Sequence, residues 1–263
     1  MEEPYFLEEI GDDGVARVTL TRVHVHNAFN DLMIAELTRS LAGLESDRRV
    51  RVVVLAAQGG SFSAGADLTW MKRMAEYGEA ENLEDARALA QLMRRLNELS
   101  KPTLALVQGP AFGGGVGLVA CCDIAIAAES ASFCLSETRL GLIPAAISPY
   151  VIAAMGERAA RRYFLSAERF SAAEAQRLGL VHEVLPDEQL EARGQHLAKA
   201  LLAGGPRALQ AAKKLISDVG RRPPDEDLVE DTARRIAGLR SGKEAREGIA
   251  AFLEKRKPRW RED

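Results

Sequence analysis

Three short and almost wholly apolar runs constrain the fold of this chain more than any other feature. They cover residues 50–56, 103–107 and 123–127, and β-branched residues dominate the first of them. Apolar runs of this length without alternation are typical of strands that are buried on both faces of a parallel sheet. An amphipathic pattern over residues 83–99 separates the first two runs, and Pro102 ends it. This order of strands and helices predicts an α/β fold with a mainly parallel, layered sheet.

The N-terminal segment predicts one further strand pair and a helix. Residues 15–20 alternate between apolar and polar side chains, which predicts a strand, and residues 4–10 should pair with it across a Gly-Asp-Asp-Gly turn. Residues 31–44 carry apolar side chains at helical spacing. Asn30 and Asp31 are both residue types that cap a helix N-terminus, so either can begin this helix.

The pattern changes in the last quarter of the chain. No strand signal follows residues 181–185, and Gly-Arg-Arg-Pro-Pro and Ser-Gly interrupt the helical spacing that comes after them. Helices are expected at residues 206–219, 225–239 and 242–256. We therefore predict a catalytic core in residues 1–200 and a helical region in residues 201–263.

Composition disfavours several classes of protein. A net charge of −3 argues against a nucleic-acid-binding surface, for which a basic balance would be expected. The cysteines at 121, 122 and 134 have no CxxC spacing and offer no disulfide framework, which favours a reducing cytoplasm. The acidic N-terminus does not resemble a signal peptide, and no apolar run is long enough for a membrane span.

A glycine-rich run follows the strand expected at residues 103–107. Gly113, Gly114 and Gly115 stand where a helix should begin, and Gly117 follows. The G-x-G-x-x-G fingerprint fails because its sixth position is Leu118, and the Gly-Lys-Ser/Thr of a phosphate loop is absent. The run is therefore either a tight turn that packs two backbones together or a helix start whose free N–H groups, with Gly114 best placed, receive an oxyanion.

A second small-residue turn precedes Asp67. Ser63 does not fit the G-x-S-x-G nucleophile elbow, because the residue two before it is Ser61. Asp67 either caps the helix that follows or belongs to a binding site. If this turn and the glycine run meet, one N–H group from each makes an oxyanion hole for an enolate or a tetrahedral oxyanion formed from a thioester.

Glu137 is the one carboxylate in the otherwise apolar run at residues 133–137. It is either a charge at a helix start or a buried catalytic acid. Burial raises the pKa of a carboxyl group toward neutrality, which suits proton transfer at carbon.

In combination these motifs resemble the enoyl-CoA hydratase/isomerase (crotonase) family. The turn at residues 64–67 is followed roughly fifty residues later by the triple glycine, and then by Ser136-Glu137 with Leu140-Gly141 and Pro144. The likeness covers nearly the whole chain. Residues 112–118, 134–137 and 147–150 are most similar to bacterial methylglutaconyl-CoA hydratases of leucine catabolism, with isohexenylglutaconyl-CoA hydratases as a related group.

The resemblance implies a fold, a site and a partner. The fold is a spiral of ββα units whose C-terminal helices trimerise, often as a dimer of trimers. The N–H groups of Ala66 and Gly114 should hold the thioester carbonyl. Coenzyme A should enter as part of the substrate, with no metal or redox cofactor. The positions expected to line it are Ala64, Gly65, Asp67 and Leu68, with Phe252 and Lys255 from the C-terminal region.

One departure from the family pattern bears on the reaction. Typical hydratases of the family use two glutamates; the second matches Glu137, but the first belongs at Gly117. Three alternatives follow: Glu137 alone adds water to a 2-enoyl-CoA, Glu137 shuttles a proton in a double-bond isomerase, or the protein binds acyl-CoA without turnover. The subgroup resemblance favours hydration, and a dicarboxylic substrate would need a cation. Candidate cations are Lys72, Arg87 and Arg139.

Overall fold

A six-stranded sheet forms the centre of the computed structural model, which describes residues 4–220 and 222–261. The strand order is β1-β2-β3-β4-β6-β9. The strands are β1 (Phe6–Ile10), β2 (Val15–Leu20), β3 (Val52–Ala57), β4 (Thr103–Val107), β6 (Ile124–Ala128) and β9 (Glu183–Leu185). β1 runs antiparallel to β2, and every other neighbouring pair is parallel. The predicted α/β fold with a mainly parallel sheet is confirmed.

The middle of the chain alternates its strands between the main sheet and a small second sheet. It contains β5 (Ala111–Phe112), β7 (Ser132–Cys134) and β8 (Phe170–Ser171), in the order β5-β7-β8. The chain passes from β4 to β5 and from β6 to β7, so that each of these repeats gives one strand to each sheet. Strands of two or three residues carry no recognisable periodicity, and the sequence predicted none of the three.

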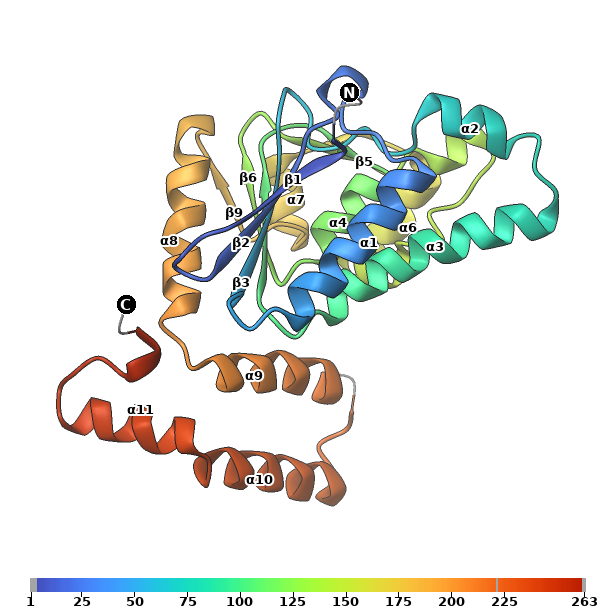
Figure 1. Ribbon diagram of the computed structural model, residues 1–263. Coiled ribbons are helices and arrows are strands. Elements are labelled where there is room, and N and C mark those ends of the chain that lie inside the picture. Colours follow the sequence, from blue (N-terminus) through green and yellow to red (C-terminus); the bar gives the residue numbers. More distant parts are fainter. Residues whose placement is uncertain (1–3, 221, 262–263) are drawn as a thin grey trace.

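Helices cover both faces of the main sheet, as the apolar strands require (Figure 1). Val53 and Leu55 point into the core that α1, α3 and α4 share, whereas Val52 and Val54 pack with residues of α8 on the other face. The helices of this part are α1 (Asp31–Ser46), α2 (Leu68–Met74), α3 (Glu79–Glu98), α4 (Gly114–Cys121), α5 (Ser148–Met155), α6 (Glu157–Ser166), α7 (Ala172–Leu178) and α8 (Leu190–Leu202). Short 3-10 helices lie at η1 (Val23–Val25), η2 (Glu137–Leu140), η3 (Asp187–Gln189) and η4 (Arg259–Arg261).

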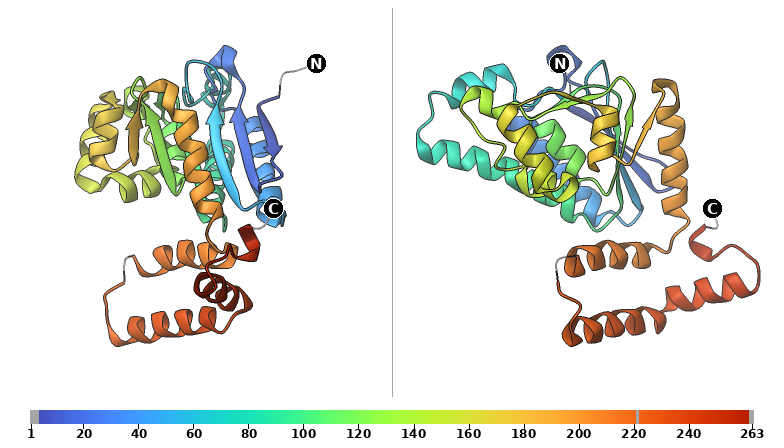
Figure 2. Two further views of the ribbon diagram at one scale, coloured as in Figure 1. Left: turned by 90° about the vertical axis from the view of Figure 1, so that its left-hand side faces the viewer. Right: turned by 180° about the vertical axis from the view of Figure 1, so that it is seen from behind.

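The last three long helices form a layer below the sheet in all three views (Figures 1 and 2). They are α9 (Pro206–Val219), α10 (Glu226–Arg240) and α11 (Lys243–Leu253), and no strand follows β9 in the described part of the chain. The helical C-terminal region is therefore confirmed. Residue 200 lies in the last turn of α8, and the division into domains at 200 and 201 stays a prediction.

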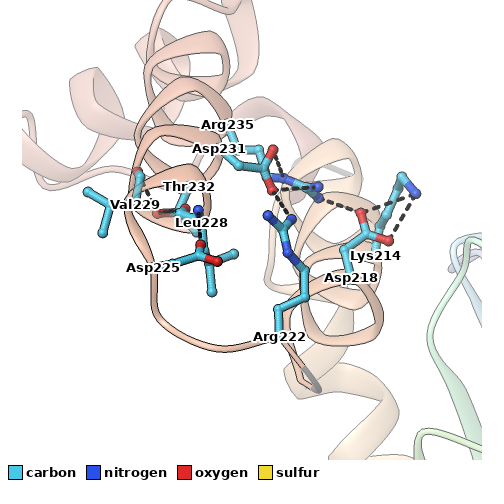
Figure 3. A network of polar contacts seen from close by, with 9 residues as sticks. All are labelled: Lys214, Asp218, Arg222, Asp225, Leu228, Val229, Asp231, Thr232 and Arg235. Carbon is cyan, nitrogen blue, oxygen red and sulfur yellow. Dashed lines mark hydrogen bonds and ion pairs between the residues drawn. The ribbon is translucent and has the colours of Figure 1, made fainter.

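Ion pairs rather than a core connect α9 to α10 (Figure 3). Asp218 accepts hydrogen bonds from Lys214 and Arg235, and Asp231 pairs with Arg222 and Arg235. Neither helix contains a buried residue. Exposed ion pairs contribute little to stability because water and salt screen them, so they stabilise this layer weakly. The apolar faces of α9 and α10 consequently remain largely uncovered in a single chain.

Candidate active site

Two turns of the chain meet at the start of α4. A Cβ atom added to Gly65 would lie 3.9 Å from the Cα atom of Gly113, so the two backbones are close. The backbone of Gly65 has φ of +87°. Gly113 itself has φ of +48°. A side chain at either position would be strained, and at Gly65 it would also press on the carbonyl oxygen of Phe112 at 3.1 Å. The two glycines therefore allow the contact that brings Ala66 and Gly114 together.

Hydrogen bonds fix the Ala66 turn from both sides. The Phe29 N–H donates to the carbonyl oxygen of Gly65 at 2.7 Å, and the Asp67 N–H donates to that of Phe29 at 2.7 Å. The Ser63 carbonyl accepts from the Phe112 N–H at 2.8 Å, which ties the same turn to β5. These contacts use the neighbours of Ala66 and leave its own N–H without an acceptor among the described residues.

The second free N–H group stands at the N-terminus of α4. Gly114 is the first residue of this helix, and its N–H has no acceptor within residues 4–220 and 222–261. The ring of Phe29 lies 2.9 Å from the position of a Cβ on Gly114. The backbone of Phe29 thus holds the turn that carries Ala66, and its ring packs against Gly114. Two free N–H groups, one of them at the positive end of a helix dipole, can stabilise an oxyanion.

Glu137 lies against the same turn. The Gly113 N–H donates to the carbonyl oxygen of Cys134 at 2.9 Å, and Glu137 begins η2 three residues later. A Cβ atom added to Gly113 would lie 3.1 Å from the Oε1 atom of Glu137, so the carboxyl group is close to this backbone. Its Oε2 atom is buried and has no hydrogen-bond partner in the described part of the chain. A carboxyl group in this setting is available to a reacting molecule.

Burial controls the protonation of Glu137. It raises the pKa of the carboxyl group above the ordinary value of a glutamate, and a hydrogen bond with its own backbone N–H opposes part of that effect. A carboxyl group with a raised pKa both accepts and returns protons more readily near neutral pH. Glu137 thus stands at a helix start, as one alternative had it, and its partly buried carboxyl group also fits the other; its catalytic role stays a prediction.

Gly117 lies one turn beyond the free N–H of Gly114 on α4. A Cβ at this position would be 2.2 Å from Cγ2 of Ile147 and 3.2 Å from Cε of Met93. Ile147 and Met93 are 2% and 0% exposed, so the space beside Gly117 is filled with apolar atoms. The site has one carboxylate on this face of α4, and the packing leaves no room for a second at position 117.

The side chain of Asp67 is already engaged. It caps α2 by accepting from the Thr69 and Trp70 N–H groups, and it pairs with Arg22 at 3.0 Å. Burial alone would raise the pKa of Asp67, but these hydrogen bonds outweigh it and hold the pKa below the usual range. Asp67 is thus the helix cap that the sequence offered as one alternative, and any contact with coenzyme A stays a prediction.

The other expected coenzyme A positions divide into two groups. Ala64 and Leu68 are exposed, the latter by 75%, on the turn that carries Ala66. Phe252 is 83% exposed at the end of α11, and Lys255 follows with φ of +54°. Figures 1 and 2 place α11 at the opposite end of the molecule from α2. A single chain therefore does not bring the C-terminal positions to the turn, and their role stays a prediction.

Other chemistries find little support in the site. The three cysteines are free and buried, and burial raises the pKa of the Cys122 thiol to about 12, so it does not ionise readily. No group of three or more His, Cys, Asp or Glu side chains in residues 4–220 and 222–261 could hold a metal ion. No helix of the described residues is long and apolar enough to cross a membrane.

Sequence reasoning identified Ala66, Gly114 and Glu137 but gave no role to Phe29 or Ile147. Ile147 belongs to one of the segments that carry the family resemblance. The contacts of Phe29 and Ile147 with Gly114 and Gly117 join segments far apart in the chain, and no local pattern signals such contacts.

Comparisons with known proteins identify the family and the fold of this chain. A model of the enoyl-CoA hydratase/isomerase family matches residues 11–263. The crystal structure of an enoyl-CoA hydratase from Shewanella pealeana superposes with a TM-score of 0.94 at 46% identity, covering 98% of this chain and 96% of that one. The crotonase fold that the resemblance implied is thereby confirmed.

Two relatives from Escherichia coli differ in the reaction that their names describe. The 2,3-dehydroadipyl-CoA hydratase is 35% identical, over 93% of this chain and 94% of its own length. The 1,2-epoxyphenylacetyl-CoA isomerase is also 35% identical, over 95% of each chain.

Proposed function

Since the chain belongs to the enoyl-CoA hydratase/isomerase family, we propose that it adds water to a branched 2-enoyl-CoA thioester, 3-methylglutaconyl-CoA or a similar compound. One observation carries the proposal. A partly buried carboxyl group, Glu137, whose Oε2 atom is buried and unpartnered among the described residues, lies against the turn whose two free N–H groups can hold the thioester oxygen.

The reaction then proceeds with these groups alone. The Ala66 and Gly114 N–H groups bind the thioester oxygen and stabilise the negative charge that develops on it. The ionised Glu137 takes a proton from water as the new bond forms between the water oxygen and C3. The C2=C3 electron pair moves toward the thioester oxygen, and Glu137 returns its proton to C2. No cofactor beyond the coenzyme A of the substrate is required.

Isomerisation is the second candidate, and Gly117 is the observation that favours it. A single carboxylate is sufficient to move a proton between the α and γ carbons without water. A relative named 1,2-epoxyphenylacetyl-CoA isomerase shows that the family includes isomerases as well as hydratases. A protein that only bound acyl-CoA would have no need of a carboxyl group with a raised pKa at this turn.

Product masses distinguish the two reactions. The purified protein should be incubated with 3-methylglutaconyl-CoA, crotonyl-CoA and a 3-enoyl-CoA. The proposal expects the first substrate to gain one water. A double bond that moves with no change of mass on any substrate would make the protein an isomerase, and no turnover at all would favour the binding protein.

The pH dependence of turnover should report Glu137. Hydration needs the ionised carboxylate, so kcat/KM should rise with pH through the pKa of Glu137 in the free enzyme and then level off. Because burial raises that pKa, the midpoint should lie above the ordinary pKa of a glutamate. Initial rates across a pH series measure it. A midpoint below the ordinary value would contradict a buried acid.

The acyl chain of the proposed substrate is dicarboxylic. A methylglutaconyl group carries a second carboxylate, and Lys72, Arg87 and Arg139 are exposed in the structure. The hydratase relative is named for a dehydroadipyl-CoA. Binding of a dicarboxylic acyl-CoA should therefore exceed that of a plain branched one, and equal affinities would count against a leucine-degradation substrate.

We also propose a homotrimer or a dimer of trimers. The apolar residues on the C-terminal layer are exposed, among them Ile216 by 72%, Val229 by 62% and Leu253 by 73%. A second copy would cover such surfaces and could bring Phe252 and Lys255 to a neighbouring site. Size-exclusion chromatography showing a monomer would remove this part of the proposal. A cytoplasmic location stays a prediction.

A further inference from the structure

The side chains of Arg22 and Asp67 form a nearly buried ion pair beside the turn that carries Ala66. Their charged groups are 3.0 Å apart, and the two side chains are only 12% and 9% exposed. Burying two charges costs free energy, which is recovered only where the geometry is good and the other polar groups are also satisfied. The cap of α2 needs Asp67 but not Arg22, so the cap alone does not explain the pair.

The Arg22 guanidinium joins the two segments that set the direction of the Ala66 N–H group. Its Nη1 atom donates to the carbonyl oxygen of Ala28 at 2.5 Å, and its Nη2 atom donates to Oδ2 of Asp67 at 3.0 Å. Between these contacts, Phe29 and Ala66 form a parallel bridge that two backbone hydrogen bonds close. The guanidinium therefore ties the residue before Phe29 to the residue after Ala66.

The guanidinium is itself held in place. Arg22 lies just beyond the end of β2, and its carbonyl oxygen accepts from the Asn27 N–H at 2.9 Å. Its Cζ atom lies 5.4 Å from the centroid of the Tyr5 ring, as in a cation–π contact. A guanidinium presents its donors in a rigid planar fork, whereas a lysine carries a point charge on a flexible stem. Arg22 thus connects the turn rigidly to the end of a strand of the main sheet.

The pair also sets the charge beside Ala66. The carboxylate of Asp67 belongs to the next residue, and an unpaired anion there would oppose the negative charge that develops on a thioester oxygen. Among the residues that the structure describes, Arg22 is the cation that forms an ion pair with Asp67. Its guanidinium therefore neutralises this anion.

We propose that Arg22 is a positioning residue for the oxyanion hole, because it fixes the direction of the Ala66 N–H group and neutralises the carboxylate beside it. This inference rests on the proposed function, since it takes the Ala66 and Gly114 N–H groups as the site that binds the thioester oxygen. Arg22 acts through the turn. A displaced donor stabilises the transition state less, so the loss should fall on kcat more than on KM.

Steady-state kinetics on 3-methylglutaconyl-CoA gives the first readout. Arg22→Ala should lower kcat about 10- to 100-fold and change KM by no more than a few-fold, because a small displacement in a site can cost about 10²-fold in rate. Arg22→Lys keeps the charge without the planar fork and should recover part of the loss.

Arg193→Ala is the matched control. Arg193 also forms an ion pair with two hydrogen bonds, to Glu183, and the two side chains are 34% and 32% exposed. It lies in α8, on the face of the main sheet opposite α4. Its removal should leave kcat within a few-fold of the wild type.

The vibrational frequency of the bound thioester carbonyl reports the hole itself. Glu137→Gln serves as the parent, since it should bind 3-methylglutaconyl-CoA without converting it, and an isotopic carbon label at C1 identifies the band. Hydrogen bonds from the Ala66 and Gly114 N–H groups should lower this frequency relative to the free thioester. Adding Arg22→Ala to the parent should move the band part of the way back, whereas adding Arg193→Ala should not move it.

The outcomes separate the two claims. A parent that does not bind the thioester, or binds it with an unshifted band, would overturn the proposed function. A shifted parent band that both Arg22→Ala and Arg22→Lys leave unchanged would overturn the role of Arg22, whatever their stability, because a merely structural contact does not act on the carbonyl. If Arg22→Ala does not fold, Arg22→Lys decides alone, and it should show a smaller shift and a lower kcat than the protein with Arg22.

Discussion

Glu137→Gln should lower turnover by about 10²- to 10⁴-fold, the usual contribution of general acid–base catalysis. The amide keeps the shape of the side chain but can neither take a proton from water nor return one to C2. Binding of the substrate should change little, because the Ala66 and Gly114 N–H groups are untouched. The loss should therefore appear in kcat rather than in KM, and steady-state kinetics on 3-methylglutaconyl-CoA measures it.

The stability of this variant provides an internal check. Burial raises the pKa of Glu137, so the folded state binds its proton more tightly than the unfolded chain does. That contribution is fully present below the pKa of the unfolded chain and is lost as the pH rises through the folded pKa. Glu137→Gln should therefore be at least as stable as the wild type at neutral pH, with the difference vanishing in acid.

Glu129→Gln is a suitable control, because Glu129 is exposed just beyond β6. It should keep full activity. If Glu137→Gln retained turnover within a few-fold of the wild type, Glu137 would not be the acid–base group.

Gly117→Ala should be the most destabilising of the conservative glycine changes in the helices. A glycine inside a helix normally costs about 0.5–1 kcal/mol relative to alanine, so the substitution would ordinarily stabilise. Here the added Cβ would overlap Cγ2 of Ile147 at 2.2 Å, and overpacking of a core costs about 1–3 kcal/mol. We expect the free energy of unfolding to fall by that amount, measured by urea or thermal unfolding.

Gly43→Ala is the matched control for this change. Gly43 lies in α1 with no atom within 4 Å of an added Cβ, so the same substitution should leave stability unchanged or raise it. Combining Gly117→Ala with Ile147→Ala should cost less than the two single changes together, because the smaller side chain removes the overlap. Additive losses would mean that Ile147 does not occupy the place beside Gly117.

Local patterns predicted the main sheet and the C-terminal helices well. The strand at Val15–Leu20 and the helix at Pro206–Val219 have the predicted ends, and Asn30 caps α1 by accepting from the Met33 N–H. The strand expected at residues 50–56 is found at Val52–Ala57. These elements carry strong periodicity or clear capping and turn residues, which act locally.

The site was only partly predictable because its contacts are non-local. Glycine and alanine at the two turns indicated free N–H groups, and the apolar surroundings of Glu137 indicated burial. The sequence also offered a cap as one role for Asp67, but it could not show that Arg22 pairs with it. The filling of the Gly117 position depends on Ile147, thirty residues away in the chain, and only the folded packing shows it.

The most direct test of the account follows the oxygen of water. Purified wild type and Glu137→Gln should be incubated with 3-methylglutaconyl-CoA in water enriched in the heavy oxygen isotope, and the products examined by mass spectrometry. Hydration by Glu137 should place one heavy oxygen atom on C3 of the wild-type product and give almost no labelled product from the variant. Unlabelled product with a shifted double bond, or equal labelling by both proteins, would contradict hydration by Glu137.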